Sequence, residues 1–261
     1  MTDTGPVRVA ATPAPQPRRP TVIVDDLHVT YRVFATGRPA NDQRKLLKRS
    51  TSMRRAREVQ ALRGLSFVAR EGEAIGVVGH NGSGKSTLLS AIAGLVPPTQ
   101  GAIYAETEPT LLGVNAAMIN ELSGERNVFL GGLALGMTMD EVRSKYAGIV
   151  EFSGIGDVMD LPMRTYSAGM AARLRFSIAA AVPHRVLLID EALAVGDKQF
   201  QIRSEQRIRE LREQAGTVFL VSHALSTIKA TCNRALWIDH GLLRLDGPAA
   251  EVVDAYSDSV H

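Results

Sequence analysis

The chain has 261 residues, of which 45% are hydrophobic and 22% are charged, and its formal net charge is +3. This is enough apolar material for one large α/β domain, or for one domain with an inserted subdomain. The single cysteine, Cys232, excludes an intrachain disulfide, and no segment reaches the roughly 18 consecutive apolar residues of a membrane-spanning helix.

The positive charge is concentrated in one segment. Residues 38–57 hold eight Lys or Arg residues against one acid, Asp42, a sum of +7 that leaves −4 for the rest of the chain. This distribution argues against a uniformly basic surface, so we expect no nucleic-acid partner. The basic segment needs a local explanation, and we expect it to form a helix and a loop within an insert at residues 36–58.

The first third of the chain predicts a tail and then strands. Residues 1–20 are rich in proline and arginine and lack the apolar core of a secretory signal, which indicates a flexible tail. Strands are predicted at residues 21–34, 62–68 and 74–78, followed by a helix over 88–95. Pro97 and Pro98 would stop that helix.

The remainder predicts an α/β fold with a mainly parallel sheet. Helical spacing dominates between residues 113 and 175, as in 139–152, which indicates an inserted helical subdomain. Buried strands then return at 186–189 and 218–221, each after a helical stretch, as crossover helices between parallel strands require. Residues 235–246 predict a closing hairpin.

A phosphate-binding loop is predicted directly after the strand at residues 74–78. The segment fits the pattern G-x-x-x-x-G-K-[ST], and its residues are Gly79, His80, Asn81, Gly82, Ser83, Gly84, Lys85, Ser86 and Thr87. The glycines permit backbone angles that turn successive N–H groups towards an anion, and the following helix start adds partial positive charge. Lys85 would reach the terminal phosphates of a nucleotide, and Ser86 would offer its hydroxyl to Mg²⁺. A glycine-rich turn without a ligand is the alternative.

Two acids and a histidine follow the later strands. Asp190 and Glu191 come directly after the apolar run 186–189, where α/β sheets place their ligands. Asp190 suits coordination of Mg²⁺, and Glu191 can orient the water that attacks the γ-phosphate. His223, at the end of the next buried strand, could reach the same phosphate, although such residues also occur in solvated turns or in structural roles.

A second helix start with anion-binding character lies at residues 166–170. Ser167, Ala168 and Gly169 precede an alanine-rich helical stretch and could present N–H groups to an anion. A simple N-cap at Ser167 is the alternative. A second phosphate-type site beside one nucleotide loop makes sense if it meets the nucleotide held by another copy of the chain.

In this order and at these spacings, the motifs resemble the ATP-binding-cassette (ABC) ATPases, with Tyr166–Met170 matching the family's LSGGQ-type signature. The resemblance implies a P-loop NTPase fold with a mainly parallel core sheet, an antiparallel β subdomain and the inserted helical subdomain. It also implies ATP and Mg²⁺ as ligands and a head-to-tail dimer, in which Ser167 and Gly169 contact the partner's nucleotide. Asp197 matches the D-loop position, His223 the switch histidine, and Tyr31 the aromatic residue that stacks on adenine.

The resemblance is strongest to the ATPase subunits that export lipid-linked polysaccharides, such as O-antigen, capsule, teichoic-acid and galactan exporters. It covers residues 22–256 and includes Tyr-Ser-x-Gly-Met at the signature and the run Leu122-Ser123-Gly124-Glu125-Arg126-Asn127. It implies a peripheral ATPase on the cytoplasmic face of the cell membrane, bound to a multi-pass membrane subunit and acting on a lipid-linked glycan. A soluble ABC ATPase acting on nucleic acid, or an importer or small-molecule exporter subunit, remains an alternative.

The chain departs from the family pattern in two places. The usual Q-loop glutamine is missing, and the nearest polar residue there is Asn115. The C-terminal carbohydrate-binding domain of some O-antigen members is also missing, so we do not expect this subunit to recognise a glycan cap. Residues 21–261 are therefore interpreted as one ABC ATPase domain, with a nucleotide-binding core at 21–112 and 176–261.

Overall fold

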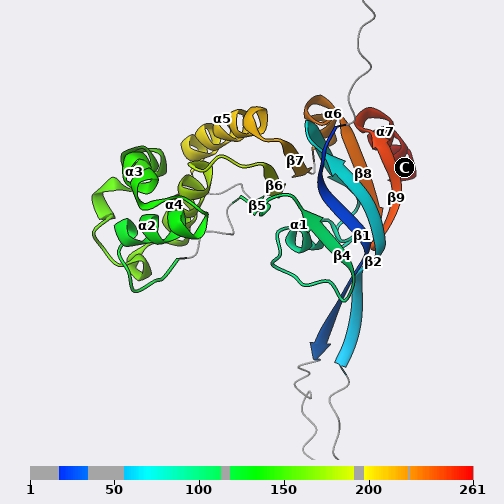
Figure 1. Ribbon diagram of the computed structural model, residues 1–261, viewed down its shortest axis with the longest axis horizontal. Coiled ribbons are helices and arrows are strands. Elements are labelled where there is room, and N and C mark those ends of the chain that lie inside the picture. Colours follow the sequence, from blue (N-terminus) through cyan, green and yellow to red (C-terminus); the bar gives the residue numbers. More distant parts are fainter. Residues whose placement is uncertain (1–17, 35–55, 113–117, 191–196, 223, 261) are drawn as a thin grey trace, which may run out of the picture.

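The computed structural model describes residues 18–34, 56–112, 118–190, 197–222 and 224–260. Two sheets lie beside each other, and three helices form a separate group on the left of Figure 1. The expected α/β class, with a mainly parallel sheet and a second, antiparallel sheet, is confirmed. Among the described helices, none is long and apolar enough to cross a membrane.

The larger sheet is parallel apart from one edge strand. Its strand order is β5-β6-β7-β3-β8-β9, and only β9 runs antiparallel to its neighbour. All five residues of β7 are buried, as a parallel strand covered on both faces requires. The bounds are β3 Glu73–Val78, β5 Thr110–Leu111, β6 Val186–Asp190, β7 Thr217–Val221, β8 Arg234–Asp239 and β9 Leu242–Pro248.

The smaller sheet is antiparallel, with the order β2-β1-β4. Its strands are β1 Pro20–Phe34, β2 Ala56–Arg70 and β4 Gln100–Ala105. Residues 56–58, which we expected inside the basic insert, belong to β2, because β2 pairs with the full length of β1. The rest of the insert, residues 36–55, lies outside the described residues.

Helix α1 is packed between the two sheets and spans Lys85–Ile92. Its Leu88 and Leu89 belong to one buried cluster with Leu62 of β2 and Ile75 of β3. The helix begins three residues before the expected start at 88 and ends before 95, where Gly94 turns the chain with a φ of 72°. Its start therefore coincides with the end of the glycine loop.

The helices α2 Gly124–Ala134, α3 Met139–Ser153 and α4 Ala168–Ala180 surround a hydrophobic core of their own. Two short 3-10 turns, Gly156–Val158 and Met163–Thr165, join α3 to α4. Thr138 and Glu141 form a capping box that fixes the start of α3. Helix α4 continues past residue 175, so the boundary expected at that position falls within a helix.

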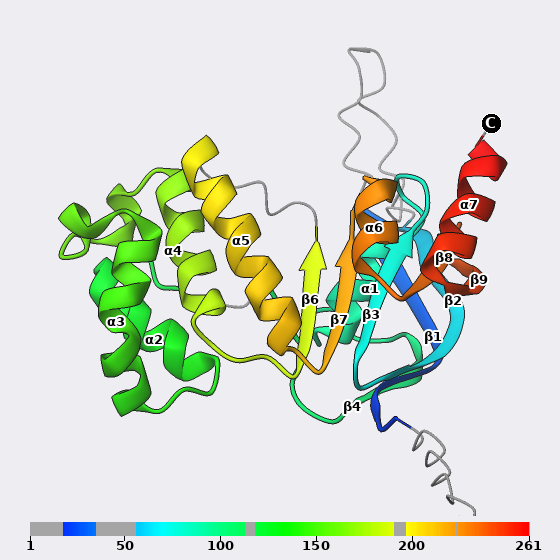
Figure 2. The same cartoon turned by 90° about the horizontal axis from the view of Figure 1, so that it is seen from above.

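Three further helices cover the other face of the large sheet, as the view in Figure 2 makes clear for α5 and α6. They are α5 Lys198–Gln214, α6 Leu225–Thr231 and α7 Ala249–Val260. Phe200 and Leu211 of α5 pack in one cluster with Leu187 of β6 and Leu220 of β7. The strand β6 is therefore held from both faces, which fixes the position of Asp190 at its end.

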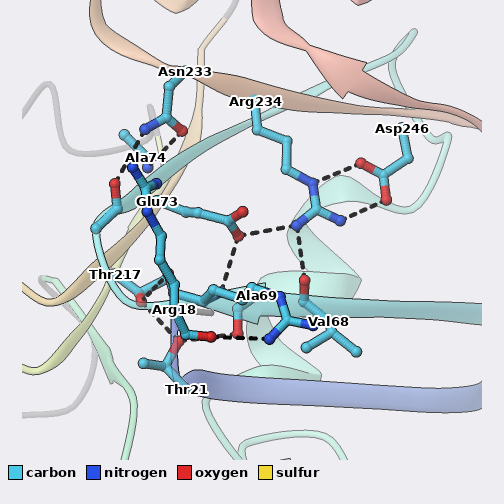
Figure 3. Close-up of polar contacts among 12 residues, drawn as sticks. Arg18, Thr21, Val68, Ala69, Glu73, Ala74, Thr217, Asn233, Arg234 and Asp246 are labelled. Atoms are coloured by element: carbon cyan, nitrogen blue, oxygen red, sulfur yellow. Dashed lines mark hydrogen bonds and ion pairs between the residues drawn. The ribbon is translucent and has the colours of Figure 1, made fainter. Parts of the chain in front are cut away.

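A polar network joins the two sheets at the starts of the parallel strands (Figure 3). Arg234 donates to Asp246 through Nε at 2.7 Å and Nη2 at 2.6 Å, and through Nη1 to Glu73 at 2.9 Å and to the carbonyl of Val68 at 2.7 Å. The hydroxyls of Thr21 and Thr217 lie 2.7 Å apart. These bonds stabilise the end of the sheet where the parallel strands start. The glycine loop lies at the opposite end.

Candidate nucleotide site

The glycine loop between β3 and α1 wraps around the side chain of Lys85. The φ angles of Gly79, Gly82 and Gly84 are 148°, 78° and 113°, in the region that side chains with a Cβ rarely adopt. The ammonium Nζ of Lys85 donates to the carbonyl of Gly79 at 2.7 Å and to that of His80 at 2.9 Å. The loop therefore holds one buried cation at its centre.

Two of these glycines are also required by close packing. A Cβ on Gly79 would lie 2.1 Å from the carbonyl oxygen of Ile238, and one on Gly84 would lie 2.7 Å from that of Ala61. The N–H of Gly241, in the turn after β8, donates to the carbonyl of Ser83 at 2.8 Å. Strands β2 and β8 thus fix the loop from outside.

The loop has the features of an anion site. No side chain caps the start of α1 at Gly84, and the first N–H groups of a helix have no partner within the helix. A Cβ on Gly82 would meet nothing within 4 Å, and the hydroxyl of Ser83 is buried without a hydrogen-bond partner among the described residues. These donors and the Lys85 ammonium suit a phosphate chain.

Asp190, the predicted Mg²⁺ ligand, lies at the edge of the sheet where β6, β7 and β3 end. The three strands are neighbours, and Asp190 is in register with Val221. Asp190 is half-buried there, and Ser86 is exposed on the first turn of α1, so a carboxylate and a hydroxyl suited to Mg²⁺ are present near the loop. Glu191, His223 and Asn115 lie outside the described residues.

The second predicted helix start lies at the beginning of α4. The hydroxyl of Ser167 accepts a bond from the N–H of Met170 at 3.2 Å, which makes Ser167 the N-cap. Ser167 and Ala168 are exposed. A Cβ on Gly169 would meet only the hydroxyl of Ser167, at 3.9 Å. This chain's own packing therefore does not require glycine at position 169, whereas close approach of another molecule would.

The comparisons with known proteins agree with this geometry. The family model described as "ABC transporter" matches residues 62–194, about half of the chain. An O-antigen export system ATP-binding protein, RfbB of Klebsiella pneumoniae, is 36% identical over 214 residues, which are 82% of this chain and 87% of that protein. The chain belongs to the ABC transporter family.

One further relative is named for teichoic acid export, and one solved structure shares the fold. A teichoic acids export ATP-binding protein, TagH of Lactococcus lactis, is 41% identical over 200 residues. Those residues are 77% of this chain but only 43% of TagH, so the chain spans less than half the length of that relative. The dimeric ATP-binding cassette MJ0796 bound to ADP and Pi shares the fold, with a TM-score of 0.62 and 19% identity over 87% of this chain and 98% of that one.

Tyr166 opens the segment predicted to be the signature and anchors it to the helical group. Its hydroxyl donates to the carbonyl of Val158 at 2.6 Å. Burial is the largest influence on this group and raises the pKa of Tyr166, so the hydroxyl stays protonated and able to donate. A Cβ on Gly124 would lie 2.2 Å from that hydroxyl, which explains the glycine at the start of α2.

Asp197, at the D-loop position, caps helix α5. Its Oδ1 accepts from the N–H of Phe200 at 2.9 Å, and its Oδ2 accepts from Arg173 of α4 at 3.2 Å. The bond from Phe200 is the largest influence and lowers the pKa of Asp197, with Arg173 acting in the same direction. The structure therefore gives Asp197 a positioning role within its own chain.

Tyr31 lies on β1 with 39% of its surface exposed. It borders a groove of about 820 Å³ between the end of β1 and the segment 96–100. Among the described residues that line this groove, none belongs to the phosphate loop. Its contact with adenine therefore stays a prediction.

Arg173 and Asn127, which make several polar contacts, were missed by the functional interpretation of the sequence. Arg173 had no motif to mark it, because its partner Asp197 lies 24 residues away. Asn127 was quoted only as part of a family motif, yet it is fully buried. Its amide accepts from the N–H of Ile119 at 2.7 Å and donates to the carbonyls of Ile119, Leu122 and Ser123.

Proposed function

We propose that the chain is the ATP-binding and ATP-hydrolysing subunit of an ABC exporter for a lipid-linked polysaccharide. The substrate class is a polyprenyl-diphosphate glycan, such as O-antigen or cell-wall galactan. The observation that carries the ATPase assignment is the glycine loop, which places the buried Lys85 ammonium at the uncapped start of α1. The export assignment is supported by the relatives named for O-antigen and teichoic acid export.

Each group at the loop has a distinct task in hydrolysis. The loop N–H groups and Lys85 bind and orient the β- and γ-phosphates. Glu191 orients the attacking water, and His223 contacts the γ-phosphate from the neighbouring strand. Mg²⁺, held by Ser86 and Asp190, would neutralise phosphate charge. Tyr31 would stack on the adenine.

A second copy of the chain completes the site. Ser167, Ala168 and Gly169 of one copy would approach the nucleotide held by the phosphate loop of the other. This proposal is supported by the exposed start of α4, where the chain's own packing leaves room at Gly169. The dimeric cassette MJ0796, which has the same fold, was solved with ADP and Pi.

The dimer would act on the cytoplasmic face of the membrane, as a peripheral pair bound to a multi-pass membrane subunit. The basic segment 38–57 would lie near anionic headgroups or the substrate's diphosphate, since each basic residue near an anionic leaflet contributes about 1 kcal/mol. Neutralising Arg44, Lys45, Lys48 and Arg49 together should reduce glycan export and leave basal ATPase activity unchanged. Unchanged export would refute this role.

Glu191→Gln tests the proposed hydrolysis. Without the carboxylate, ATP binding should persist, turnover should stop, and a closed dimer should accumulate with ATP in size-exclusion chromatography. Lys85→Ala is the comparison, because it should lose ATP binding and stay monomeric. Normal hydrolysis by Glu191→Gln would refute the role given to Glu191.

The substrate needs a separate experiment. The chain, purified with its membrane subunit in lipid nanodiscs, should hydrolyse ATP faster when a polyprenyl-diphosphate glycan is added. Undecaprenyl phosphate without a glycan is the control. Equal rates with both lipids would refute the glycan substrate and leave the ATPase assignment standing.

A further inference from the structure

Two histidines and an aspartate meet at the phosphate loop. None of the three side chains has a part in the hydrolysis proposed above. His80 belongs to the loop, Asp239 ends β8, and His240 begins the turn to β9. One ligand atom from each residue lies within 4.8 Å of the other two. In the sequence, His80 is only a position of the loop, and Asp239 and His240 have no role beyond the hairpin.

Both ring nitrogens of His80 face oxygen atoms. Its Nδ1 lies 2.7 Å from the carbonyl oxygen of Asn81, and its Nε2 lies 3.0 Å from Oδ1 of Asp239. Both partners only accept hydrogen bonds when Asp239 is ionised, whereas a neutral imidazole carries one N–H. With the N–H on Nδ1, bonded to the carbonyl of Asn81, the Nε2 lone pair is directed at Oδ1 of Asp239, and a metal ion between these two atoms would bind both.

His240 adds a second imidazole beside the same carboxylate oxygen. Its Nε2 lies 3.7 Å from the same Oδ1, and its ring centroid lies 4.7 Å from that of His80. The backbone of His240 has a φ of 47°, in the left-handed region that few non-glycine residues adopt. This conformation turns the second imidazole towards the carboxylate.

The carboxylate is fixed and charged. Arg244 donates to Oδ2 of Asp239 through Nε at 3.2 Å and Nη2 at 3.1 Å, which leaves Oδ1 for the histidines. Desolvation is the largest influence and acts to raise the pKa of Asp239. The bond from Arg244 and the other partners outweigh it, and the net pKa is lowered. Asp239 therefore presents Oδ1 to both imidazoles while Arg244 holds Oδ2.

We propose that His80, Asp239 and His240 bind a divalent transition-metal ion of the Zn²⁺ type. Ligand atoms about 2.0–2.1 Å from a tetrahedral zinc lie about 3.3 Å from one another, and the observed 3.0 Å and 3.7 Å fall on either side of that value. Two imidazoles favour Zn²⁺, Co²⁺, Ni²⁺ or Cu²⁺ over Mg²⁺, which prefers oxygen ligands. The side chain of His240 is 72% exposed, so the ion can enter from solvent.

The ion would connect the phosphate loop to the β8–β9 turn. Among the described residues, a backbone hydrogen bond from Gly241 to Ser83 already joins the turn to the loop. Because His80 is part of the loop that binds nucleotide, metal binding and nucleotide binding would be thermodynamically linked, each changing the affinity of the other by the same factor.

The test is a Zn²⁺ titration of the full chain, free of any polyhistidine tag, in competition with a chromophoric chelator and with millimolar Mg²⁺ to saturate oxygen sites. The wild type should bind one Zn²⁺ per chain. His240→Asn removes the imidazole but tolerates the left-handed backbone, and it should weaken binding by at least about tenfold. A circular dichroism spectrum and melting temperature equal to the wild type would show that this variant is folded.

His28→Ala is the matched control. The Nε2 of His28 lies 3.1 Å from Oδ1 of Asp26, which is the same kind of pair without a second histidine, and its loss should leave Zn²⁺ affinity unchanged. Co²⁺ should give a visible d–d absorption in the wild type and in His28→Ala but not in His240→Asn. No Zn²⁺ uptake by the wild type, or equal affinity in His240→Asn, would overturn the proposal.

Discussion

Arg173 of α4 and Asp197 at the start of α5 form an ion pair, with Nη1 3.2 Å from Oδ2. The guanidinium carbon of Arg173 also lies 6.0 Å from the ring centroid of Phe200. The segment predicted to be the signature lies at the start of helix α4, and α5 follows the strand that carries Asp190. The pair therefore joins the element that would face the partner's nucleotide to the element beside the chain's own nucleotide.

Replacing Arg173 by Ala should reduce ATPase activity several-fold and leave ATP binding intact, because the start of α5 loses its link to the signature helix. Steady-state hydrolysis and fluorescent nucleotide binding would measure the two effects. Arg143→Ala is the control, since Arg143 and Asp140 form a pair at 3.0 Å on the exposed face of α3. Equal activity in the two variants would contradict a coupling role for Arg173.

Gly169→Ala should separate folding from activity. Alanine is the better helix former, and its Cβ would meet only Ser167 at 3.9 Å, so stability should rise by about 0.5 kcal/mol or stay unchanged. ATPase activity should fall at least tenfold, because the added methyl group would block close approach of the partner's nucleotide. Urea denaturation and steady-state hydrolysis measure the two quantities.

Gly148→Ala provides the matched control for that variant. Gly148 lies within α3, and a Cβ there would meet nothing within 4 Å. The same small gain in stability is expected, by about 0.5–1 kcal/mol, with no change in activity. If Gly169→Ala were as active as Gly148→Ala, the start of α4 would not contact nucleotide in a dimer.

The elements with strong local signals could be predicted from sequence. The glycine loop follows a buried strand and precedes a helix, and the apolar runs of β6 and β7 are short and end in polar residues. Neighbouring parallel strands bring such ends to one edge, so the grouping of Asp190 with the loop could be inferred. The strands β4 and β5 were missed, because β4 is largely exposed and β5 has only two residues.

Contacts between distant segments carried no signal in the sequence. His80 and Asp239 are 159 positions apart, and their meeting depends on β3 and β8 being neighbours in the sheet. The signature Ser167 shows a different limit, because its hydroxyl caps α4 and the same residue type suits both capping and phosphate binding. Residue chemistry alone could not separate capping from phosphate binding. The free space at Gly169 favours contact with another molecule, because the chain's own packing does not need glycine there.

Replacing Asn127 by Ala should destabilise the helical group by about 2–4 kcal/mol, because the buried Asn127 amide would lose four hydrogen bonds to the segment 119–123. The midpoint of chemical unfolding would measure the loss. Asn120→Ala is the control, since Asn120 is exposed in the same segment, and a change within about 0.5 kcal/mol is expected. Equal midpoints would show that the amide of Asn127 contributes little.

Acid should destabilise the fold partly through His184. This histidine is buried between α4 and β6, with Nε2 2.8 Å from the carbonyl of Ala179. Desolvation, the largest influence, lowers the pKa of His184 from its ordinary value of 6.5. Below pH 6.5 the unfolded chain binds a proton that the folded chain does not, so this contribution to stability is present above that pH and is lost as the pH falls towards the folded pKa.

His184→Gln keeps a donor for Ala179 but cannot titrate, so its unfolding free energy should fall less than that of the wild type between pH 7 and about pH 5. Parallel curves for the two proteins would show that His184 is not a source of the pH dependence.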